Sequence, residues 1–310
     1  MTQALQLMVP RTVLYAAFAG ICLLLSLFIT FPYEAIQQRI EIEAARAGLS
    51  VKLGSLGPAL FGVTASRVQI GPAVEGDAAQ ETLLIPEIVV RPTLFPLGVR
   101  FKAKAFGGSL EGSTGQGSKA EINLHFEGLD LSQGNLQALS GVDLSGKLSG
   151  HLALTLPVAA PPGAKAKVAD LSQADGQITL DAAGLLVNGG TVKVPMYGSL
   201  APMDLPKVAL GNLELRLNFD KGLGTIESLK TSGGDLDLNA TGTLKLARKL
   251  DYSEPNVDIK LRASPEMVKR LGILGSGLSL LPSDRSDPST KSAHLSGYLG
   301  KPRFAPGAKN

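Results

Sequence analysis

Apolar and polar residues alternate strictly along many segments that follow residue 50. In residues 212–219, for example, Leu213, Leu215, Leu217 and Phe219 alternate with polar or charged side chains. Such alternation indicates a β-strand with one apolar and one solvated face, because successive side chains of a strand point to opposite sides. Short clusters of Gly, Pro and Asp separate these segments, as the turns of an antiparallel meander require. The sequence therefore predicts a mainly β fold.

The apolar positions of these segments form a candidate apolar groove face. Its members are Val99, Phe101, Ile122, Leu124, Phe126, Leu152, Leu154, Leu213, Leu215, Leu217, Phe219, Leu236, Leu238, Leu244, Leu246, Val257, Ile259 and Leu261. About fourteen strands would each have such a face, whereas only two or three short helices are predicted to cover them. We therefore expect a long, curved antiparallel sheet, a groove or a flattened roll, that extends ~65 Å and folds over itself or binds a ligand or partner.

Helices are expected at few places. Residues 33–47 place apolar side chains on one helical face, and Gly48 is a suitable stop. A Ser-Pro-Glu start at Ser264 predicts a helix over 265–274, and one or two helical turns are expected within 132–140. Two long loops are expected at 160–173, a candidate hinge between two sheet halves, and at 275–289. A last strand over 293–304 and a tail over 305–310 complete the chain.

An uncharged apolar segment lies at residues 12–31. From Val13 to Phe31 it contains 19 residues. As a helix it would rise about 29 Å, close to the ~30 Å hydrocarbon core of a bilayer. The sequence thus predicts one transmembrane helix over 12–31, which separates an N-terminal segment, 1–11, from a juxtamembrane helix within 32–48 and a β domain over 49–304.

Three other interpretations of the apolar segment are less favoured. A cleaved signal peptide would end in a small-residue cleavage site, which is absent at the exit from the segment. A lipoprotein cysteine at Cys22 is disfavoured because the bulky Ile21 precedes it. A soluble core helix of this length would carry a polar stripe. A short head and a large following domain fit a short cytoplasmic N-terminus and an exported C-terminal domain, whereas the few Lys and Arg residues that flank the segment do not decide its orientation.

Charge and cysteine content exclude some classes of function. The net charge is +3, without a Lys/Arg cluster, so we expect no nucleic-acid partner. Cys22 is the only cysteine, so the large domain contains no disulfide. Three histidines, His125, His151 and His294, lie far apart without the ligand spacing of a metal site.

No catalytic constellation is recognisable. Asp235 and Asp237 point to the same side of a predicted strand, which is the ordinary behaviour of a polar face. The segment from Gly141 to Lys147 imitates a phosphate-binding loop, but Leu148 stands where a Ser or Thr would bind magnesium. We therefore expect a protein that is not an enzyme, with no catalytic residue, metal or cofactor.

The order of segments resembles the AsmA-like superfamily of inner-membrane proteins. The resemblance rests on the apolar segment and short helix, the strand pair at 51–71, the unit VRPTLFPLGVRFKAKAFGGSLEGS at 90–113, and HLSGYLGKPRF at 294–304. The middle of the chain is similar to the protein N family of the bacterial type II secretion system. That similarity is carried by LSGKLSGHLALTLP at 144–157, DGQITLDAAGLLVNGG at 175–190, and the segment 205–246. It covers nearly the whole chain, and its specificity comes from the order of these Gly/Leu patterns.

The resemblance implies a Gram-negative inner-membrane anchor, a periplasmic β domain and an accessory role in protein export across the outer membrane. Other secretion subunits and inner-membrane lipid are the expected partners, with docking by an edge strand or by the groove rim. A different hypothesis is a lipid-transfer protein whose groove holds the acyl chains of a bound phospholipid. A third, a periplasmic hydrolase, has no acid–base or nucleophile set in its favour.

Overall fold

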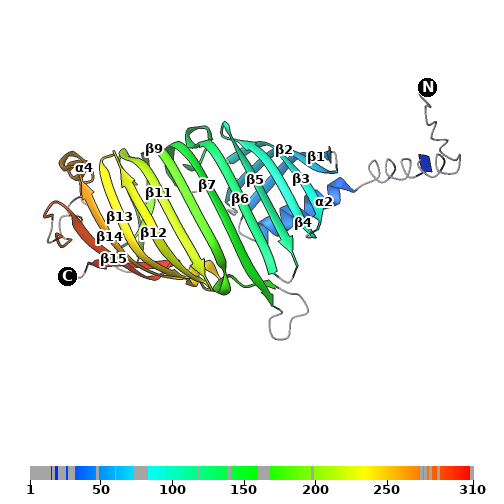
Figure 1. Ribbon diagram of the computed structural model, residues 1–310. Helices are drawn as coiled ribbons and strands as arrows, with labels where there is room; N and C mark the ends of the chain where they lie inside the picture. The colour runs from blue at the N-terminus through cyan, green and yellow to red at the C-terminus, as the bar shows by residue number, and fades with distance from the viewer. Residues whose placement is uncertain are drawn as a thin grey trace, which may run out of the picture.

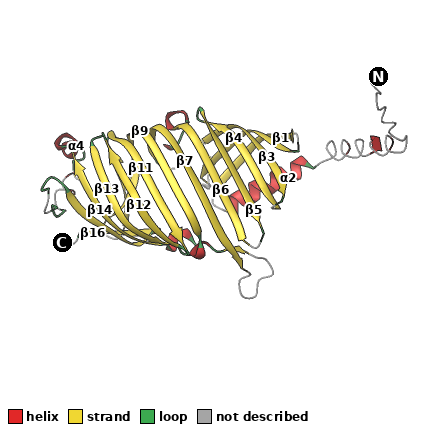
Figure 2. Ribbon diagram, in the orientation of Figure 1, coloured by secondary structure: helices red, strands yellow, loops and turns green. Residues whose placement is uncertain are grey.

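A computed structural model describes residues 15, 18–19, 26, 32–46, 49–59, 61–72, 83–95, 97–117, 119–137, 141–159, 168–196, 199–272, 275, 278, 281–284 and 287–307. Strands account for 68% of the structure, and they form one large antiparallel sheet that does not close on itself. Figures 1 and 2 show the strands side by side in a single curved layer, with few helices. The predicted mainly β fold with a long curved sheet is confirmed.

Fourteen strands follow one another across the sheet in nearly sequential order. They are β1 (Leu49–Ala59), β2 (Gly62–Pro72), β3 (Leu83–Leu94), β4 (Leu97–Ala105), β5 (Gly108–Gln116), β6 (Lys119–Asp130), β7 (Val142–Ala159), β9 (Asp175–Met196), β11 (Val208–Asp220), β12 (Leu223–Ser232), β13 (Leu236–Lys245), β14 (Glu254–Ala263), β15 (Lys291–Tyr298) and β16 (Lys301–Pro306). Two short strands lie off this path: β8 (Val168–Ala169) pairs with β7, and β10 (Ser199–Leu205) pairs with β9.

The register aligns apolar positions from one end of the sheet to the other. One row of directly opposed residues crosses all fourteen strands: Pro58, Val63, Val90, Phe101, Gly112, Leu124, Leu152, Ile178, Leu217, Ile226, Gly242, Val257, Leu295 and Phe304. Directly opposed residues of paired strands point to the same side of a sheet. We call the side that carries this row the inner face and the opposite side the outer face.

Three phenylalanine rings of the inner face lie against cross-strand glycines. The directly opposed pairs are Phe101 with Gly112, Phe126 with Gly150, and Phe219 with Gly224. A Cβ atom added to these glycines would lie 2.3, 2.6 and 2.6 Å from an atom of the facing ring, so only glycine leaves room for the aromatic side chain. Glycine weakens a strand on its own, and an aromatic neighbour that covers it offsets part of this cost.

Two helices of more than one turn flank the described sheet. The helix α2 (Tyr33–Arg46) lies beside β1, and Gln37 Nε2 donates a hydrogen bond to the Leu53 carbonyl over 3.2 Å. The helix α4 (Pro265–Arg270) begins where Ser264 Oγ accepts the Met267 N–H at 3.2 Å. It ends before residue 274, the expected limit, and Gly272 with φ of 56° turns the chain away from the helical path.

Three single helical turns also lie between strands. They are η1 (Leu131–Gln133), η2 (Leu171–Gln173) and η3 (Leu250–Tyr252). The first two share the sequence Asp-Leu-Ser-Gln, and in both the Asp carboxylate accepts hydrogen bonds from the Ser N–H and hydroxyl. This Asx-type cap fixes each turn locally.

The predicted membrane helix falls almost entirely outside the described residues, as do its expected ends Val13 and Phe31. Within 12–31 the structure describes Tyr15, Phe18, Ala19 and Ser26, all in helical conformation. Among the residues that are described, no helix has the length and apolar character needed to cross a membrane.

One expectation about connections differs from the structure. The single last strand predicted over 293–304 is instead the hairpin of β15 and β16, in which Tyr298 faces Lys301 across the two-residue loop Leu299-Gly300. So short a loop, with one turn-forming residue, leaves little mark on the hydropathy pattern. At the candidate hinge, residues 160–167 are not described, and β7 pairs directly with β9, so the sheet is continuous past this segment.

We predict that Phe219→Ala lowers the free energy of unfolding by about 3 kcal/mol, because it removes a buried ring from the central core cluster. Phe304→Ala is the matched control, since this side chain is 68% exposed. It should change the free energy of unfolding by less than about 0.5 kcal/mol. Urea unfolding of the full chain in mild detergent, followed by circular dichroism, measures both. Equal losses for the two variants would contradict this assignment of the core.

Candidate functional site

The structure brings the predicted groove residues to one side of the sheet. Seventeen of the eighteen lie in strands, and the register turns all of these to the inner face; Leu246, which directly follows β13, joins the central core cluster. Leu124 faces Leu152, for instance, and Leu238 faces Leu261. Period-two alternation therefore identified the correct face of each of these strands, because a strand's side chains alternate regardless of its partners.

Most of this inner face is only half-buried. Among the eighteen residues, Leu217, Phe219, Leu246 and Val257 are buried, with exposed fractions between 5% and 9%, and Val99 is 40% exposed. The other thirteen are partly accessible to solvent. A face covered by a second layer of structure would be buried throughout, so the inner face is an open apolar surface.

Sequence analysis missed the contribution of β9. Ile178, Leu180 and Ala182 carry the inner face from β7 to β11, facing Leu152, Gly150 and Leu148 of β7. The alternation in QITLDA was the signal that could have identified them. Three glycines with positive φ, at 184, 189 and 190, and two shifts of register interrupt the pattern later in the same strand.

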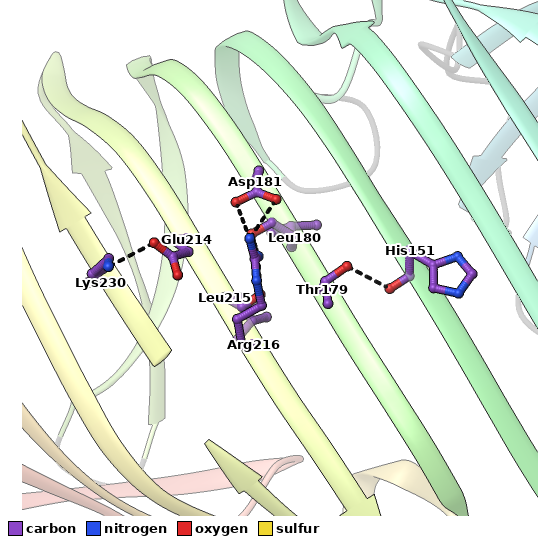
Figure 3. A network of polar contacts seen from close by, with 8 residues as sticks. All are labelled: His151, Thr179, Leu180, Asp181, Glu214, Leu215, Arg216 and Lys230. Carbon is purple, nitrogen blue, oxygen red and sulfur yellow. Dashed lines mark hydrogen bonds and ion pairs between the residues drawn. The ribbon is translucent and has the colours of Figure 1, made fainter. Parts of the chain in front are cut away.

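The inner face is also the concave one. In Figure 1 the strands of both ends of the sheet are drawn behind the middle strands. Figure 3 shows polar side chains on the near side of the middle strands β7, β9, β11 and β12, with the red C-terminal strands behind them. The polar side chains therefore lie on the convex outer face, and the apolar residues lie on the concave inner face, which we call the trough.

Cross-strand ion pairs order the outer face (Figure 3). Asp181 and Glu214 are directly opposed like charges, and each is neutralised by a different cation. Arg216 Nη2 donates to both Asp181 oxygens at 2.9 and 3.0 Å, and Lys230 Nζ lies 2.8 Å from Glu214 Oε2. The hydrogen bond from Lys230 lowers the pKa of the Glu214 carboxyl. These exposed pairs fix register more than they add stability.

The histidines lie on the outer face. His125 and His151 are directly opposed, with ring centroids 6.1 Å apart, and His294 Nδ1 lies 2.8 Å from Asp258 Oδ1. Within the described part of the chain, no group of three or more His, Cys, Asp or Glu side chains is arranged to hold a metal ion.

The two carboxylates on β13 and just before it have separate structural partners. Asp235 accepts the Ala209 N–H at 3.1 Å and lies 2.8 Å from Arg270 Nη2, whereas Asp237 pairs with Arg262 at 2.8 Å. The Ala209 N–H, and secondly Arg270, hold the pKa of Asp235 below its usual value. Asp235 therefore ties β11 to α4, a structural role.

The segment that imitates a phosphate-binding loop lies in the sheet. Lys147 is part of β7, where it faces Ala183 of β9 and Asp130 of β6. A phosphate-binding loop of that type leads into a helix, whose N-terminus contributes to anion binding. The strand that continues through Leu148 has no such terminus.

Comparisons with known proteins returned no relatives: no protein-family model, no curated protein and no solved structure matches the chain. The inner face and the two edges of the sheet are therefore the features that indicate what this protein binds. The inner face is apolar and concave. The two edges present backbone hydrogen-bonding groups.

We predict that Asp235→Asn destabilises the fold by about 1 kcal/mol at pH 7, because it removes a charged acceptor from the Ala209 N–H and from Arg270. Since the folded-state pKa is depressed, the carboxylate stabilises the fold above its unfolded pKa of about 3.9, and this contribution is lost as pH falls through the folded pKa. The difference in stability between the two proteins should therefore begin to shrink below about pH 4 and vanish below the folded pKa of Asp235.

Asp143→Asn is the matched control because Asp143 is exposed on β7. This substitution should change the unfolding midpoint little at pH 7 and at pH 3. A difference between wild type and Asp235→Asn that stays constant from pH 7 to pH 3 would show that the carboxylate charge is not what stabilises this contact.

Proposed function

We propose that this chain is a non-enzymatic component of a bacterial type II secretion system. Residues 13–31 tether it to the inner membrane, with the N-terminus in the cytoplasm and the sheet in the periplasm. The order of segments that resembles the protein N family supports this assignment. The observation that carries the binding role is the inner face, an apolar surface across fourteen strands that is half-buried over most of its length.

The edge of the sheet at β16 is poorly suited to pairing with another strand. Gly307 N donates to the Ser292 carbonyl, so the alternate residues Arg303 and Ala305 also bond toward β15. The backbone groups that point outward then belong to Pro302, Phe304 and Pro306. Because proline has no N–H, Phe304 supplies the one outward donor among these three residues. This is how natural sheets protect an edge from further pairing.

The opposite edge strand, β1, has α2 beside it. Gln37 of that helix donates to the Leu53 carbonyl, and Gln37 is itself partly buried. With one edge flanked by a helix and the other protected by prolines, the concave inner face and its rim remain for a partner. We therefore propose docking of other secretion subunits through the trough and its rim, in preference to edge-strand pairing.

A second function is favoured by the same surface: the trough holds acyl chains, and the protein carries phospholipid through the periplasm. The inner face presents leucine, isoleucine and phenylalanine without a charged side chain at Leu124, Leu152, Ile178 or their direct neighbours in that row. An acyl chain needs only such a continuous apolar surface, shielded from water on one side.

Secretion is the test of the first function. A strain that lacks this gene should release less of its type II substrates into the medium, and the wild-type gene should restore release. Leu152→Asp, which places a charge on the inner face, should fail to restore it, whereas His151→Asp, its neighbour on the outer face, should succeed. Leu215→Gln serves as a second inner-face variant. Normal secretion in the deletion strain would refute the proposal.

Lipid content is the test of the second function. Mass spectrometry of the full chain, purified in a detergent that exchanges annular lipid, should detect stoichiometric phospholipid in wild type and in His151→Asp. The Leu152→Asp and Leu215→Gln variants should lose most of it, because a polar group in the trough must be desolvated against the acyl chain. Circular dichroism and unfolding midpoints establish that the variants remain folded. Lipid retained equally by all four proteins would place it outside the trough.

A further inference from the structure

Exposed large apolar side chains gather at one edge of the N-terminal half of the sheet. Since neighbouring strands are antiparallel, the turns after β1, β3 and β5 share one edge, which we call the tip edge. Phe61, Leu94, Phe95 and Leu97 lie at these turns with exposed fractions of 81%, 73%, 96% and 66%. Toward the other edge of the same strands, Leu84 is the exposed large apolar residue among those described.

Side chains of this kind are costly to leave in water. A fully buried Leu or Phe side chain gains roughly 1.5–3 kcal/mol relative to an exposed one. Leu94, Phe95 and Leu97 follow one another on the β3–β4 hairpin, and Phe61 lies at the turn of the neighbouring β1–β2 hairpin. Exposed apolar side chains gathered in this way mark an interaction site. None of the four belongs to either core cluster of the described residues, so the patch does not serve the packing of the sheet.

The first turn of α2 lies toward the tip edge. The last residue of α2 precedes the start of β1, and Gln37 bonds the Leu53 carbonyl, so α2 runs back along β1. The N-terminal end of α2, at Tyr33, therefore lies toward the tip edge, where β1 ends. Residues 13–31, which the proposed function places in the bilayer, directly precede this helix.

Two arginines lie behind the apolar tip of the β3–β4 hairpin, and Arg91 is level with Gly62, next to Phe61. Arg91 and Arg100 are directly opposed on β3 and β4, three residues before Leu94 and three after Leu97. Both are exposed, and neither forms an ion pair within the described part of the chain. Directly opposed like charges destabilise a strand pair. Glu111, on β5, is an acidic side chain that interacts electrostatically with Arg100. Three residues of strand span about 10 Å, the depth to which apolar groups enter the lipid headgroup region.

We infer that the β1–β2 and β3–β4 tips insert into the periplasmic surface of the membrane that holds residues 13–31. Phe61, Leu94, Phe95 and Leu97 enter the boundary between headgroups and acyl chains, and Arg91 and Arg100 bind lipid phosphates there. The occupant of the patch is an anionic bilayer surface. This inference rests on the proposed membrane tether, and it sets the N-terminal end of the trough directly on the lipid.

The test uses the full chain in vesicles of phosphatidylcholine and phosphatidylglycerol. Because Cys22 is the only cysteine, Cys22→Ser gives a background for single labels. A polarity-sensitive fluorophore is attached at Phe95→Cys, and at Leu84→Cys as the matched control on the other end of β3. The label at position 95 should emit at shorter wavelength and be quenched severalfold more by spin-labelled lipid. Water-like emission at both positions would overturn the inference.

The arginine pair is tested in the same assay. Arg91→Glu combined with Arg100→Glu should reduce quenching at position 95 on anionic vesicles, whereas Lys104→Glu, on the same face but nearer the other edge, should not. Equal effects of the two changes would overturn the role of the arginines. Quenching that depends on protein density, with disulfide crosslinks at position 95, would show that a second copy covers the patch instead.

A vesicle flotation assay distinguishes failure of the proposed tether from failure of the tip contact. The unlabelled full chain should float with vesicles and resist carbonate extraction. Loss from the vesicles would overturn both the tether and the tip contact. Retention on the vesicles with position 95 in water would overturn the tip contact alone.

Discussion

The structure depends on one antiparallel ladder in one register. Each strand is hydrogen-bonded to its sequence neighbour or near neighbour, so apolar residues of fourteen strands fall on the same side. A one-residue slip at any pairing would turn all apolar residues of the following strand to the outer face. The outer-face ion pairs, such as Arg216 with Asp181 and Lys230 with Glu214, oppose such slips because they join specific cross-strand positions.

A sheet of this length has two vulnerable features, its edges and its apolar face, and the chain treats them differently. Pairing of the edge strands with another chain is hindered by α2 beside β1 and by Pro302 and Pro306 in β16. The apolar face is left open, with phenylalanine rings against glycines in place of a covering layer. Such an arrangement suits a protein that binds an apolar partner along its length, and it explains why the proposed functions centre on the trough.

Much of the fold followed from local pattern. Leu213, Leu215, Leu217 and Phe219 were placed on the correct side by alternation alone, and Ser264 with Pro265 marked the start of α4. The two-residue turn between β15 and β16 was missed, because Leu299 and Gly300 carry too weak a signal. The apolar residues of β9 were missed as part of the trough, although Ile178 and Leu180 alternate clearly.

The sequence by itself determined which residues are apolar on each strand, and that helices are too few to cover them. Both are local properties, set by the alternation of side chains along a strand and by helix-forming periodicity. Only the tertiary structure decided that these residues form one concave trough, that prolines point outward from β16, and that Phe61 and Phe95 share an edge with the approach of α2. These depend on strand order, register and direction, which join residues far apart in the chain and leave no mark on any single segment.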